Sequence, residues 1–543
     1  MCKSILLLLV LCLTSVYSRN VRFQVLSLGN KVQVRIDGGS KYTISRPKTL
    51  NDILFMSVVK NLPDAAFKYY YIVDGVREVD INGKTFERTL EKGKSHTYTD
   101  FIGRKVTVKE LPAFSYPAEK FKYSVGKKEL FDDSYIPTIH ITGSKVNDFM
   151  ANPKKYKENE VTFDKVYFYF KNGLSAVENV SATNKNRNTS KFQIRMKINN
   201  DSVYGRTVLK LRNSGEDPLN LRQYIYGNMI YNLGMPSIKS VMVRVYYNKQ
   251  PFGFYTLQEE ATSKSFIQNE FNANSEKEVD NSKSIGYLQD GTCGADFQYH
   301  PENMSYYGDF STKIGDKTRL VKLCGALDKL NTKNEKEVKE FEKKWFDIES
   351  FHKAMAMEYL TGDWDGYWYA TSNYAIYDNP AENTKTTFKH YFITQDHDET
   401  WGVGLGETHN KYGADFPKVS YKTMLNKKWN TTGGPTRTLV DKLIAGSPAL
   451  QTRFEKTLTS IVKYMYNPST FDKIVRAYMD RFRDDMIWDF SFERKYKGPS
   501  DYWDLDKCLK GYDETKVGSG LFTLKSFMTD RANAVKKEFP NYF

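Results

Sequence analysis

The hydrophobic pattern of this chain changes from that of strands to that of helices about halfway along its length. Short runs of alternating apolar and polar residues, which are typical of half-buried β-strands, recur as far as Leu257. After Glu335 the pattern is mainly helical, apart from a predicted hairpin over Tyr374–Thr394. Strands followed by helices indicate an α+β fold. The chain has 543 residues, more than one hydrophobic core normally supports, so we expect at least two domains.

The N-terminus has the pattern of a secretory signal peptide. Lys3 precedes an unbroken apolar run from Ile5 to Leu13, and Val16 and Ser18 are small or short residues at the −3 and −1 positions of a cleavage site. The run is too short to span a bilayer, and no other run approaches that length. We therefore expect residues 1–18 to be removed and the mature protein to be soluble and secreted.

Three cysteines remain once Cys2 and Cys12 have left with the expected signal peptide. They allow one disulfide and one free thiol, and we predict the pair Cys293–Cys324, with Cys508 free, because both lie in one segment. No cysteine spacing is typical of a zinc site. Five sequons fit a glycosylated protein of a eukaryotic host: Asn179, Asn188, Asn200, Asn303 and Asn430.

Residues 19–125 are predicted to form a small antiparallel β domain, sandwich-like in architecture. Short alternating runs such as Val32–Ile36 are separated by turn residues, and Asp37-Gly38 and Asn82-Gly83 mark tight turns. This region contains no cluster of residues that suggests chemistry. We interpret it as a structural or attachment module.

The region from residue 126 to 543 opens with further predicted strands and then a helix. Asp217 followed by Pro218 is typical of a helix start, and Gly234 is a stop signal. The pattern between them predicts a helix over Leu219–Leu233.

Two more predicted strands follow this helix, joined by a turn at Asn248-Lys249. Strands, one helix, two strands and a helical half are the order of elements in a two-lobed protein-kinase fold. On this interpretation the N-lobe covers about residues 126–260 and the C-lobe about residues 261–543. Order alone is weak support, since other α+β chains can be divided in the same way.

Two acidic clusters are the main candidates for chemistry. The first contains Asp363 and Asp365 and is followed by Asn373, and the second contains Asp396 and Asp398. In an extended segment residues i and i+2 share a face, so the last two carboxylates can face one cation, and oxygen ligands favour Mg²⁺ or Mn²⁺. The alternative is that these are surface carboxylates that cap helices or pair with the abundant lysines.

Lys210 is the candidate for binding a phosphate group. Apolar neighbours place it on a strand that should be largely buried on one face, where a lysine can meet nucleotide phosphates as a point charge. The alternative is a strand lysine that points to solvent, and Lys197 is the second choice for the role.

The formal net charge of +15 does not indicate nucleic-acid binding. The basic residues are dispersed, lysine-rich runs such as 336–344 also contain glutamate, and secretion would remove the chain from nucleic acid. The basic surface is better suited to acidic polymers, anionic cell surfaces or acidic protein segments.

Several ordered motifs resemble the spore coat protein CotH family, and the resemblance covers about Tyr135 to Trp488. Residues 208–271 include a lysine strand, a helix that ends in glycine and a strand hairpin, in the family's order. TGDWDGYWYATSNYAIY at Thr361–Tyr377 and DHDETWG at Asp396–Gly402 are similar to the two acidic motifs of the family. The N-terminal β region is most similar to that of fungal secreted members.

The resemblance implies an atypical, secreted protein kinase that uses ATP with Mg²⁺ or Mn²⁺ to phosphorylate Ser or Thr of extracellular or coat proteins, at the cell wall or spore surface. It implies that Asp365 is the catalytic carboxylate. It implies the following binding residues: Lys210 for the ATP phosphates, the hinge residues Gln258, Glu259 and Glu260 for the nucleotide, and Asn373 and Asp396, supported by Asp398, for the metal.

The chain also departs from the usual kinase pattern. The predicted helix 219–233 has no acidic residue, so a partner for the lysine must come from elsewhere, for example Glu216 or Glu259. Asp365 and Asn373 are eight residues apart, and an ordinary kinase catalytic loop has five. Some fungal relatives serve as adhesins or invasins, so the alternative is a catalytically weak binding protein whose partners are host-cell surface receptors. A metal-dependent hydrolase is a third possibility.

Overall fold

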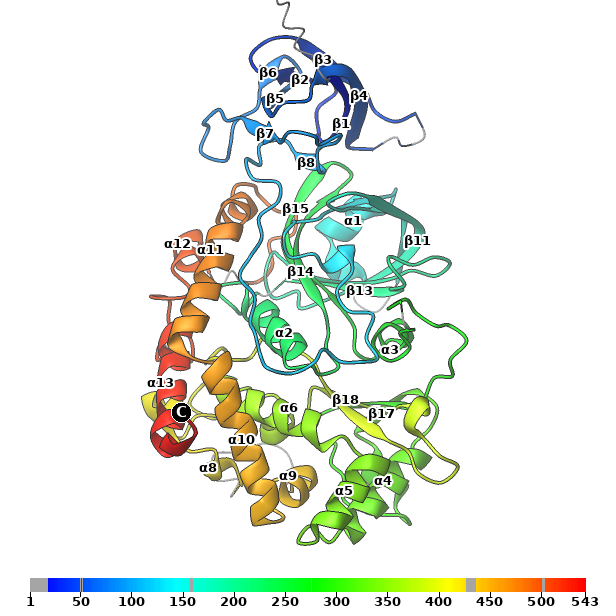
Figure 1. Ribbon diagram of the computed structural model, residues 1–543, viewed down its shortest axis with the longest axis vertical. Coiled ribbons are helices and arrows are strands. Elements are labelled where there is room, and N and C mark those ends of the chain that lie inside the picture. The colour runs from blue at the N-terminus through cyan, green and yellow to red at the C-terminus, as the bar shows by residue number, and fades with distance from the viewer. Residues whose placement is uncertain are drawn as a thin grey trace, which may run out of the picture. The chain divides into compact units, whose positions relative to one another are not determined.

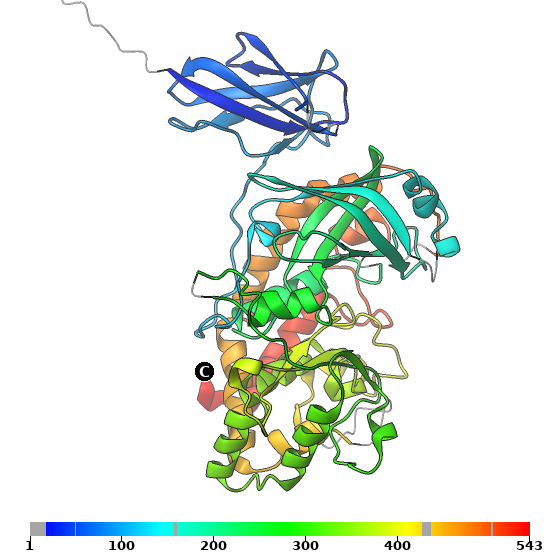
Figure 2. The same cartoon turned by 90° about the vertical axis from the view of Figure 1, so that its right-hand side faces the viewer.

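The structure is a computed structural model that describes residues 18–48, 50, 52–156, 160–213, 215–274, 276–425, 436–500 and 503–543. The expected signal peptide up to residue 17 and the sequon at Asn430 lie outside these residues. The chain is a mixed α/β protein that divides into two compact units (Figures 1 and 2). The first contains the described residues up to Lys109 with Lys171–Gly173, and the second contains Glu110–Phe170 with Leu174–Phe543. Among the described helices, none has the length and apolar character that a membrane crossing requires.

The first unit is a β-sandwich. One sheet has the order β4-β1-β8, and the other has β3-β2-β5-β6 with β7 also paired to β5. The strands are β1 (Ser18–Leu26), β2 (Val32–Ile36), β3 (Lys41–Ile44), β4 (Leu54–Pro63), β5 (Phe67–Val73), β6 (Val76–Arg77), β7 (Arg88–Leu90) and β8 (Asp100–Phe101). Apolar side chains from both sheets, such as Phe23 and Tyr71, share one core. The turn at Asp37 and Gly38 has positive φ at both residues, as the sequence predicts.

The second unit begins with a closed seven-stranded barrel in the order β10-β11-β12-β13-β15-β14-β9. The strands are β9 (Thr138–Thr142), β10 (Val161–Tyr169), β11 (Leu174–Lys185), β12 (Gln193–Lys197), β13 (Val208–Arg212), β14 (Ser240–Tyr247) and β15 (Gln250–Glu259). Their inward side chains form a separate apolar core. The predicted turn between β14 and β15 is confirmed, with φ of 42° at Asn248 and 65° at Lys249.

Helix α2 (Arg222–Asn232) begins three residues later than the sequence predicts. The carboxylate of Asp217 accepts hydrogen bonds from the backbone N–H groups of Leu219, Leu221 and Arg222, so it satisfies free amides from outside the helix. The residue at the N-cap position is Leu221. The predicted stop is confirmed, because Gly234 follows the helix with a φ of 72°.

The remainder of the second unit is mainly helical and contains one four-stranded sheet. The predicted hairpin is confirmed as β18 and β19, but two strands that the sequence did not reveal join it, in the order β17-β16-β18-β19. The strands are β16 (Leu288–Gly291), β17 (Phe310–Ile314), β18 (Tyr374–Asp378) and β19 (His390–Thr394). β16 contains Gln, Asp and Gly, which have low strand propensity, so pairing with its neighbours stabilises it.

The other helices surround this sheet and the barrel (Figure 1). They are α1 (Val146–Ala151), α3 (Lys264–Phe271), α4 (Thr318–Lys329), α5 (Glu335–Lys344), α6 (Ile348–Thr361), α7 (Tyr367–Ala370), α8 (Lys422–Leu425), α9 (Thr438–Leu443), α10 (Pro448–Tyr464), α11 (Pro468–Phe490), α12 (Leu505–Leu509) and α13 (Leu524–Glu538). Helix α6 is buried along nearly its whole length and packs against α10, α13 and β19. It therefore lies at the centre of the helical part.

The predicted disulfide Cys293–Cys324 is wrong, because Cys293, Cys324 and Cys508 are all free thiols. Cys324 is buried on α4, and its burial raises the pKa of the thiol above its ordinary value. Cys293 is exposed in the loop after β16. A position in one segment of the sequence therefore did not bring the two sulfur atoms together.

Candidate functional site

Lys210 lies on an internal strand of the barrel and is largely buried. Strand β13 pairs with β12 and β15, which places Lys210 opposite Arg195 and Gln258. The ammonium nitrogen Nζ of Lys210 is 3.8 Å from Oε2 of Glu260. Burial lowers the pKa of Lys210, and the charge of Glu260 opposes that shift. The side chain is therefore held inside the fold next to a counterion.

The acidic partner of Lys210 is Glu260. It is not Glu216 or Glu259, the two residues that the sequence suggested. Glu259 is 1% exposed and points away from Lys210, with its Oε1 2.9 Å from Nε of Arg206. Lys210 stands opposite residue 258 of β15, and alternate residues of a strand share a face. The register therefore directs residue 260 toward Lys210 and residue 259 to the other side.

Asp365 and Asn373 come together just after helix α6. The helix ends at Thr361, the capping residue Gly362 has a left-handed φ of 62°, and a tight turn follows. The Nδ2 amide of Asn373 donates to Oδ2 of Asp365 over 2.6 Å and to its backbone carbonyl over 3.1 Å. Burial raises the pKa of Asp365 to about 6, the hydrogen bond from Asn373 opposes this rise, and the charge of Asp396 adds to it. A separation of eight residues therefore still allows direct contact.

Asp396 and Asp398 share one guanidinium partner. Arg212, two residues after Lys210 on β13, is 4% exposed, and its Nη2 pairs with Oδ1 of Asp396 and, over 2.6 Å, with Oδ2 of Asp398. Burial raises the pKa of Asp398 to about 7, although Arg212 opposes the rise. Burial acts on Asp396 in the same direction, but Arg212 outweighs it and holds that pKa below its ordinary value. The single charge of Arg212 therefore offsets the charge of only one of these two carboxylates.

Arg212, Asp365, Asp396 and Asp398 line a cavity of about 210 Å³ in which negative charge exceeds positive charge, whereas Lys210 and Asn373 lie outside its lining. The lining residues are Asn186, Asn188, Thr189, Arg212, Asn213, Gly215, Glu216, Asp365, Asp396, Asp398 and Glu399. Within the described residues, Oε2 of Glu399 is a buried atom without a hydrogen-bond partner. Burial raises the pKa of Glu399 to about 9, and the charges of Asp398 and Glu216 add to the rise. An additional cation in this cavity would relieve that repulsion.

The donor atoms of the cavity fit a divalent cation that is shared with a phosphate ligand. In the part of the chain that the structure describes, no group of three or more His, Cys, Asp and Glu side chains is arranged to hold a metal ion. Mg²⁺ in nucleotide sites is usually held by one or two carboxylates together with phosphate oxygens, so such a site needs fewer protein ligands. Asp396 and Asp398 supply carboxylate oxygens of the required kind in the cavity, and Asn373 is next to it, bound to the lining residue Asp365.

His397, between the two aspartates, is buried behind the cavity and fixes their turn. Its Nδ1 is 3.0 Å from Oδ2 of Asp363, and its ring stacks on Tyr226 with 3.6 Å between the centroids. Its backbone N–H donates to the side chain of Gln223 over 2.6 Å. Helix α2 therefore supports the acidic turn, and Asp363 contacts His397 of that turn.

Sequence reasoning missed Arg212 as well as the cavity residues between β11 and β12. A signal for Arg212 was present, because it is two residues beyond Lys210 on a strand and so shares its face. The loop residues Asn186, Asn188 and Thr189 carry no local pattern that indicates a cavity. They line it only because the barrel brings their loop toward the acidic turns.

The fold and the cavity define a class of protein: a mixed α/β protein in which Arg212, on the barrel strand that also carries Lys210, and two acidic turns line one cavity. Residues 180–535 match the family described as CotH kinase protein. The chain belongs to this family, which confirms the resemblance seen in its motifs. The matched region contains Lys210 and both acidic turns.

The chain is also similar to several curated proteins of Rhizopus delemar. Invasin CotH3 is 30% identical over 497 residues, which cover 88% of this chain and 78% of that protein. Invasin CotH2 is 29% identical over 486 residues, with 86% and 78% covered. Spore coat protein homolog 1 is 26% identical over 533 residues, with 95% and 81% covered.

Proposed function

We propose that the protein is a secreted kinase that transfers the γ-phosphate of ATP, with Mg²⁺ or Mn²⁺, to Ser or Thr of extracellular or coat proteins. The observation that carries the proposal is the convergence of Arg212, Asp365 and Asp396, from distant segments, around one acidic cavity, with Lys210 near enough for the charge of Asp396 to act on its pKa. Membership of a family described as CotH kinase protein supports it. The relatives named for invasion and for the spore coat support a location at a cell or spore surface.

The proposal treats the barrel as an N-lobe and the helical part of the second unit as a C-lobe. Helix α2 would be the helix of the N-lobe, and the chain at Leu257–Glu260 would be the hinge that faces adenine. The path of the chain supports this interpretation, because β15 ends at Glu259 and the following residues leave the barrel for α3.

Asp365 is the proposed acceptor of the substrate proton. Its pKa of about 6 leaves it mostly ionised at neutral pH but close enough to neutrality for a general base. The hydrogen bond from Asn373 orients the carboxylate. As the substrate hydroxyl oxygen forms its bond to the γ-phosphorus, the bond from that phosphorus to the bridging oxygen breaks and ADP leaves with that oxygen. The hydroxyl proton passes to Asp365.

Lys210 and the acidic turn at 396–398 are proposed to bind the nucleotide. Lys210 donates to phosphate oxygens, and Glu260, which also binds Arg195 over 2.6 Å, is a counterion 3.8 Å from its ammonium group. Asp396 and Asn373, with Asp398 in support, would hold the divalent cation, which neutralises phosphate charge when it is bound. Arg212 keeps both aspartates on one side of the cavity.

Transfer of labelled phosphate from ATP by the mature protein tests this proposal, with autophosphorylation and Ser-rich or acidic proteins as readouts. Asp365→Asn keeps the size of the side chain and should lower transfer by about 10²–10⁴-fold, with little change in nucleotide affinity. Asp415→Asn alters an exposed carboxylate that pairs with Lys418 at 3.0 Å, and it should leave transfer unchanged. Equal transfer by wild type and Asp365→Asn would exclude Asp365 as the base.

The second candidate is a surface or coat protein of the same family without phosphate transfer. Two observations favour it: relatives bear the names invasin and spore coat protein homolog, and Arg212 occupies carboxylates that the kinase proposal assigns to the cation. Its partners would be receptors on host cells. Absence of transfer in wild type, together with equal binding of wild type and Asp365→Asn to cell surfaces, would favour this candidate.

A further inference from the structure

A segment near the C-terminus packs along a loop that lines the acidic cavity. We call residues 494–500 the strap and residues 186–191, between β11 and β12, the β11–β12 loop. Inward and exposed side chains alternate along the strap, as in an extended chain. Asn186, Asn188 and Thr189 of the loop line the cavity. Any element that holds this loop therefore holds one wall of the cavity.

Hydrogen bonds join the strap to two consecutive carbonyl groups of the loop. The hydroxyl of Tyr496 donates to the backbone carbonyl of Arg187 over 2.7 Å. The backbone N–H and the hydroxyl of Ser500 both donate to the carbonyl of Asn188, over 2.9 and 3.2 Å. The loop backbone thus obtains from the strap hydrogen bonds that its own turn does not supply.

Gly498 allows the strap to approach the loop closely. Its φ is 68°, and a Cβ at this position would lie 2.4 Å from the carbonyl carbon of Thr189 and 2.6 Å from the backbone nitrogen of Ser190. Such distances are far below ordinary van der Waals contact. Only glycine fits here without moving the loop or the strap.

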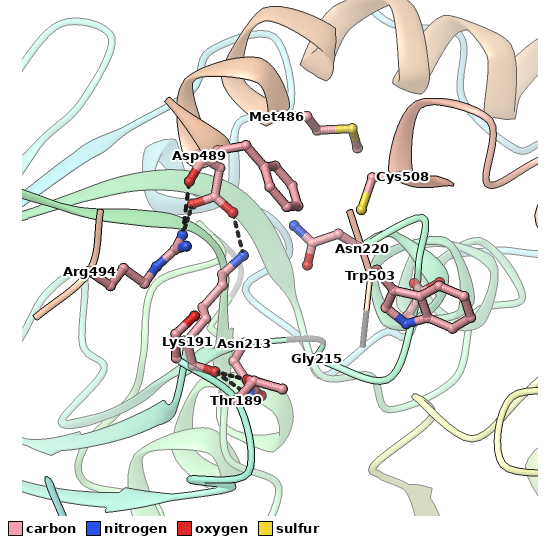
Figure 3. Close-up of a pocket in the computed structure, with 13 residues that line it drawn as sticks. Thr189, Lys191, Asn213, Gly215, Asn220, Met486, Asp489, Arg494, Trp503 and Cys508 are labelled. Carbon is pink, nitrogen blue, oxygen red and sulfur yellow. Dashed lines mark hydrogen bonds and ion pairs between the residues drawn. The ribbon is translucent and has the colours of Figure 1, made fainter. Parts of the chain in front are cut away.

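One carboxylate anchors both the strap and the loop (Figure 3). Asp489, at the end of α11, is 5% exposed, and it pairs with Arg494 of the strap over 2.6 Å and with Lys191 of the loop over 3.0 Å. It also accepts a hydrogen bond from the backbone N–H of Phe254 on β15. The first residue of the strap and the last residue of the loop are therefore tied to the same point of the barrel.

The chain beyond the strap reaches a second wall of the cavity. The indole N–H of Trp503 donates to the backbone carbonyl of Glu216 over 3.1 Å, and Glu216 lines the cavity. Residues near the C-terminus thus contact two segments that line the cavity from the barrel side. One is the β11–β12 loop, and the other is the chain at Glu216, after β13.

We propose that the strap positions the β11–β12 loop over the phosphates of the nucleotide, and that Tyr496 and Gly498 are positioning residues for phosphoryl transfer. The effect on phosphoryl transfer rests on the function proposed above, whereas the ordering of the β11–β12 loop by the strap does not. A loop that is already ordered loses less conformational freedom when the nucleotide binds. Loosening the strap should therefore raise KM for ATP and leave kcat nearly unchanged.

Two strap variants and one matched control test the catalytic effect. Tyr496→Phe removes the donor hydroxyl but keeps the ring, which packs on Phe192 with 5.9 Å between centroids. Loss of one hydrogen bond predicts a rise in KM for ATP of about three- to tenfold, with kcat within about twofold. Gly498→Ala should have a larger effect. Gly520→Ala is the control, because its φ of 76° imposes similar left-handed strain but no atom lies within 4 Å of its added Cβ, so KM for ATP should stay at the wild-type value.

Hydrogen–deuterium exchange of the peptide that spans residues 186–191, in the full chain, tests the strap without reference to activity. Exchange should be faster in Tyr496→Phe and Gly498→Ala than in wild type and Gly520→Ala. Unchanged exchange in both strap variants would overturn the proposal. Faster exchange with an unchanged KM would overturn the catalytic role. Faster exchange in a protein without transfer would support the strap and reject the kinase function.

Discussion

Replacing Arg212 with Gln should destabilise the second unit and make its stability depend on divalent cations. The guanidinium of Arg212 is buried and pairs with Asp396 and Asp398, while the side chains of the two aspartates are 42% and 26% exposed toward the cavity. Gln fills part of the space but carries no charge. The variant leaves two neighbouring carboxylates without a cation.

The expected loss in the free energy of unfolding is about 2 kcal/mol. Breaking a buried ion pair by removing one partner costs about 3–5 kcal/mol, whereas an exposed pair contributes about 0–1 kcal/mol. The pair at Arg212 lies between these cases, because the arginine is buried and the aspartates are partly exposed. In a unit of roughly 400 residues, about 2 kcal/mol corresponds to a fall in Tm of roughly 2–3 °C.

The loss should depend on pH and on metal. Without Arg212 the two carboxylates repel each other, so their folded-state pKa values rise above those of the unfolded chain. The penalty is then full above the raised pKa values and shrinks as the pH falls and the carboxyl groups take up protons. Mn²⁺ or Mg²⁺ should restore part of the Tm at pH 8, because the cation takes the place of the guanidinium.

Thermal unfolding followed by circular dichroism at pH 8 and pH 5.5, with and without Mn²⁺, measures these effects. The control is Arg476→Gln, which breaks an exposed pair with Asp513, and its Tm should stay within about 1 °C of wild type at both pH values. A Tm of Arg212→Gln equal to wild type at pH 8 would refute the ion-pair argument. A lower Tm that Mn²⁺ does not raise would refute a cation site at Asp396 and Asp398.

Two further predictions concern buried groups that do not line the cavity. Burial lowers the pKa of His352 to about 3 in the folded state. As the pH falls, the imidazole therefore takes up its proton in the unfolded chain before it does so in the folded chain. The free energy of unfolding should then fall by about 1.4 kcal/mol per pH unit below about pH 6.5. His352→Gln should flatten this slope in urea titrations between pH 6.5 and 4, and an unchanged slope would contradict the assignment. Lys239→Met leaves the buried Glu270 without its ion-pair partner and should lower the free energy of unfolding by about 3–5 kcal/mol in the same titrations at pH 7. The double variant that also carries Glu270→Gln should recover part of this stability. If the double variant is no more stable than Lys239→Met, the unpaired charge of Glu270 is not the cause of the destabilisation.

Local patterns in the sequence were sufficient to predict several turns and strands of the second unit. The turn at Asn248-Lys249, the stop at Gly234 and the hairpin of β18 and β19 all depend on conformational preferences of residues close together in the chain. The lysine strand and the acidic turns were found in the same way, and their order matched a family. Strand β16 was missed because Asp290 and Gly291 have weak strand preferences and its partner β18 is far away in the sequence. Strand β17 contains Phe310, Thr312 and Ile314, which favour strands, but this short run was not recognised.

The choice of partners within the site was decided by the tertiary structure. The sequence offered Glu216 or Glu259 to Lys210, but the register of β13 against β15 directs Glu260 toward it. Arg212 meets the two aspartates only because the barrel faces the acidic turns.

The strap contacts a loop about three hundred residues earlier in the chain, and no local pattern records that approach. The sequence by itself determined elements such as the turn at Asn248-Lys249, the stop at Gly234 and the hairpin of β18 and β19, because those preferences act between neighbouring residues. Sheet register and long-range packing determined which charges meet, because they depend on the whole folded chain.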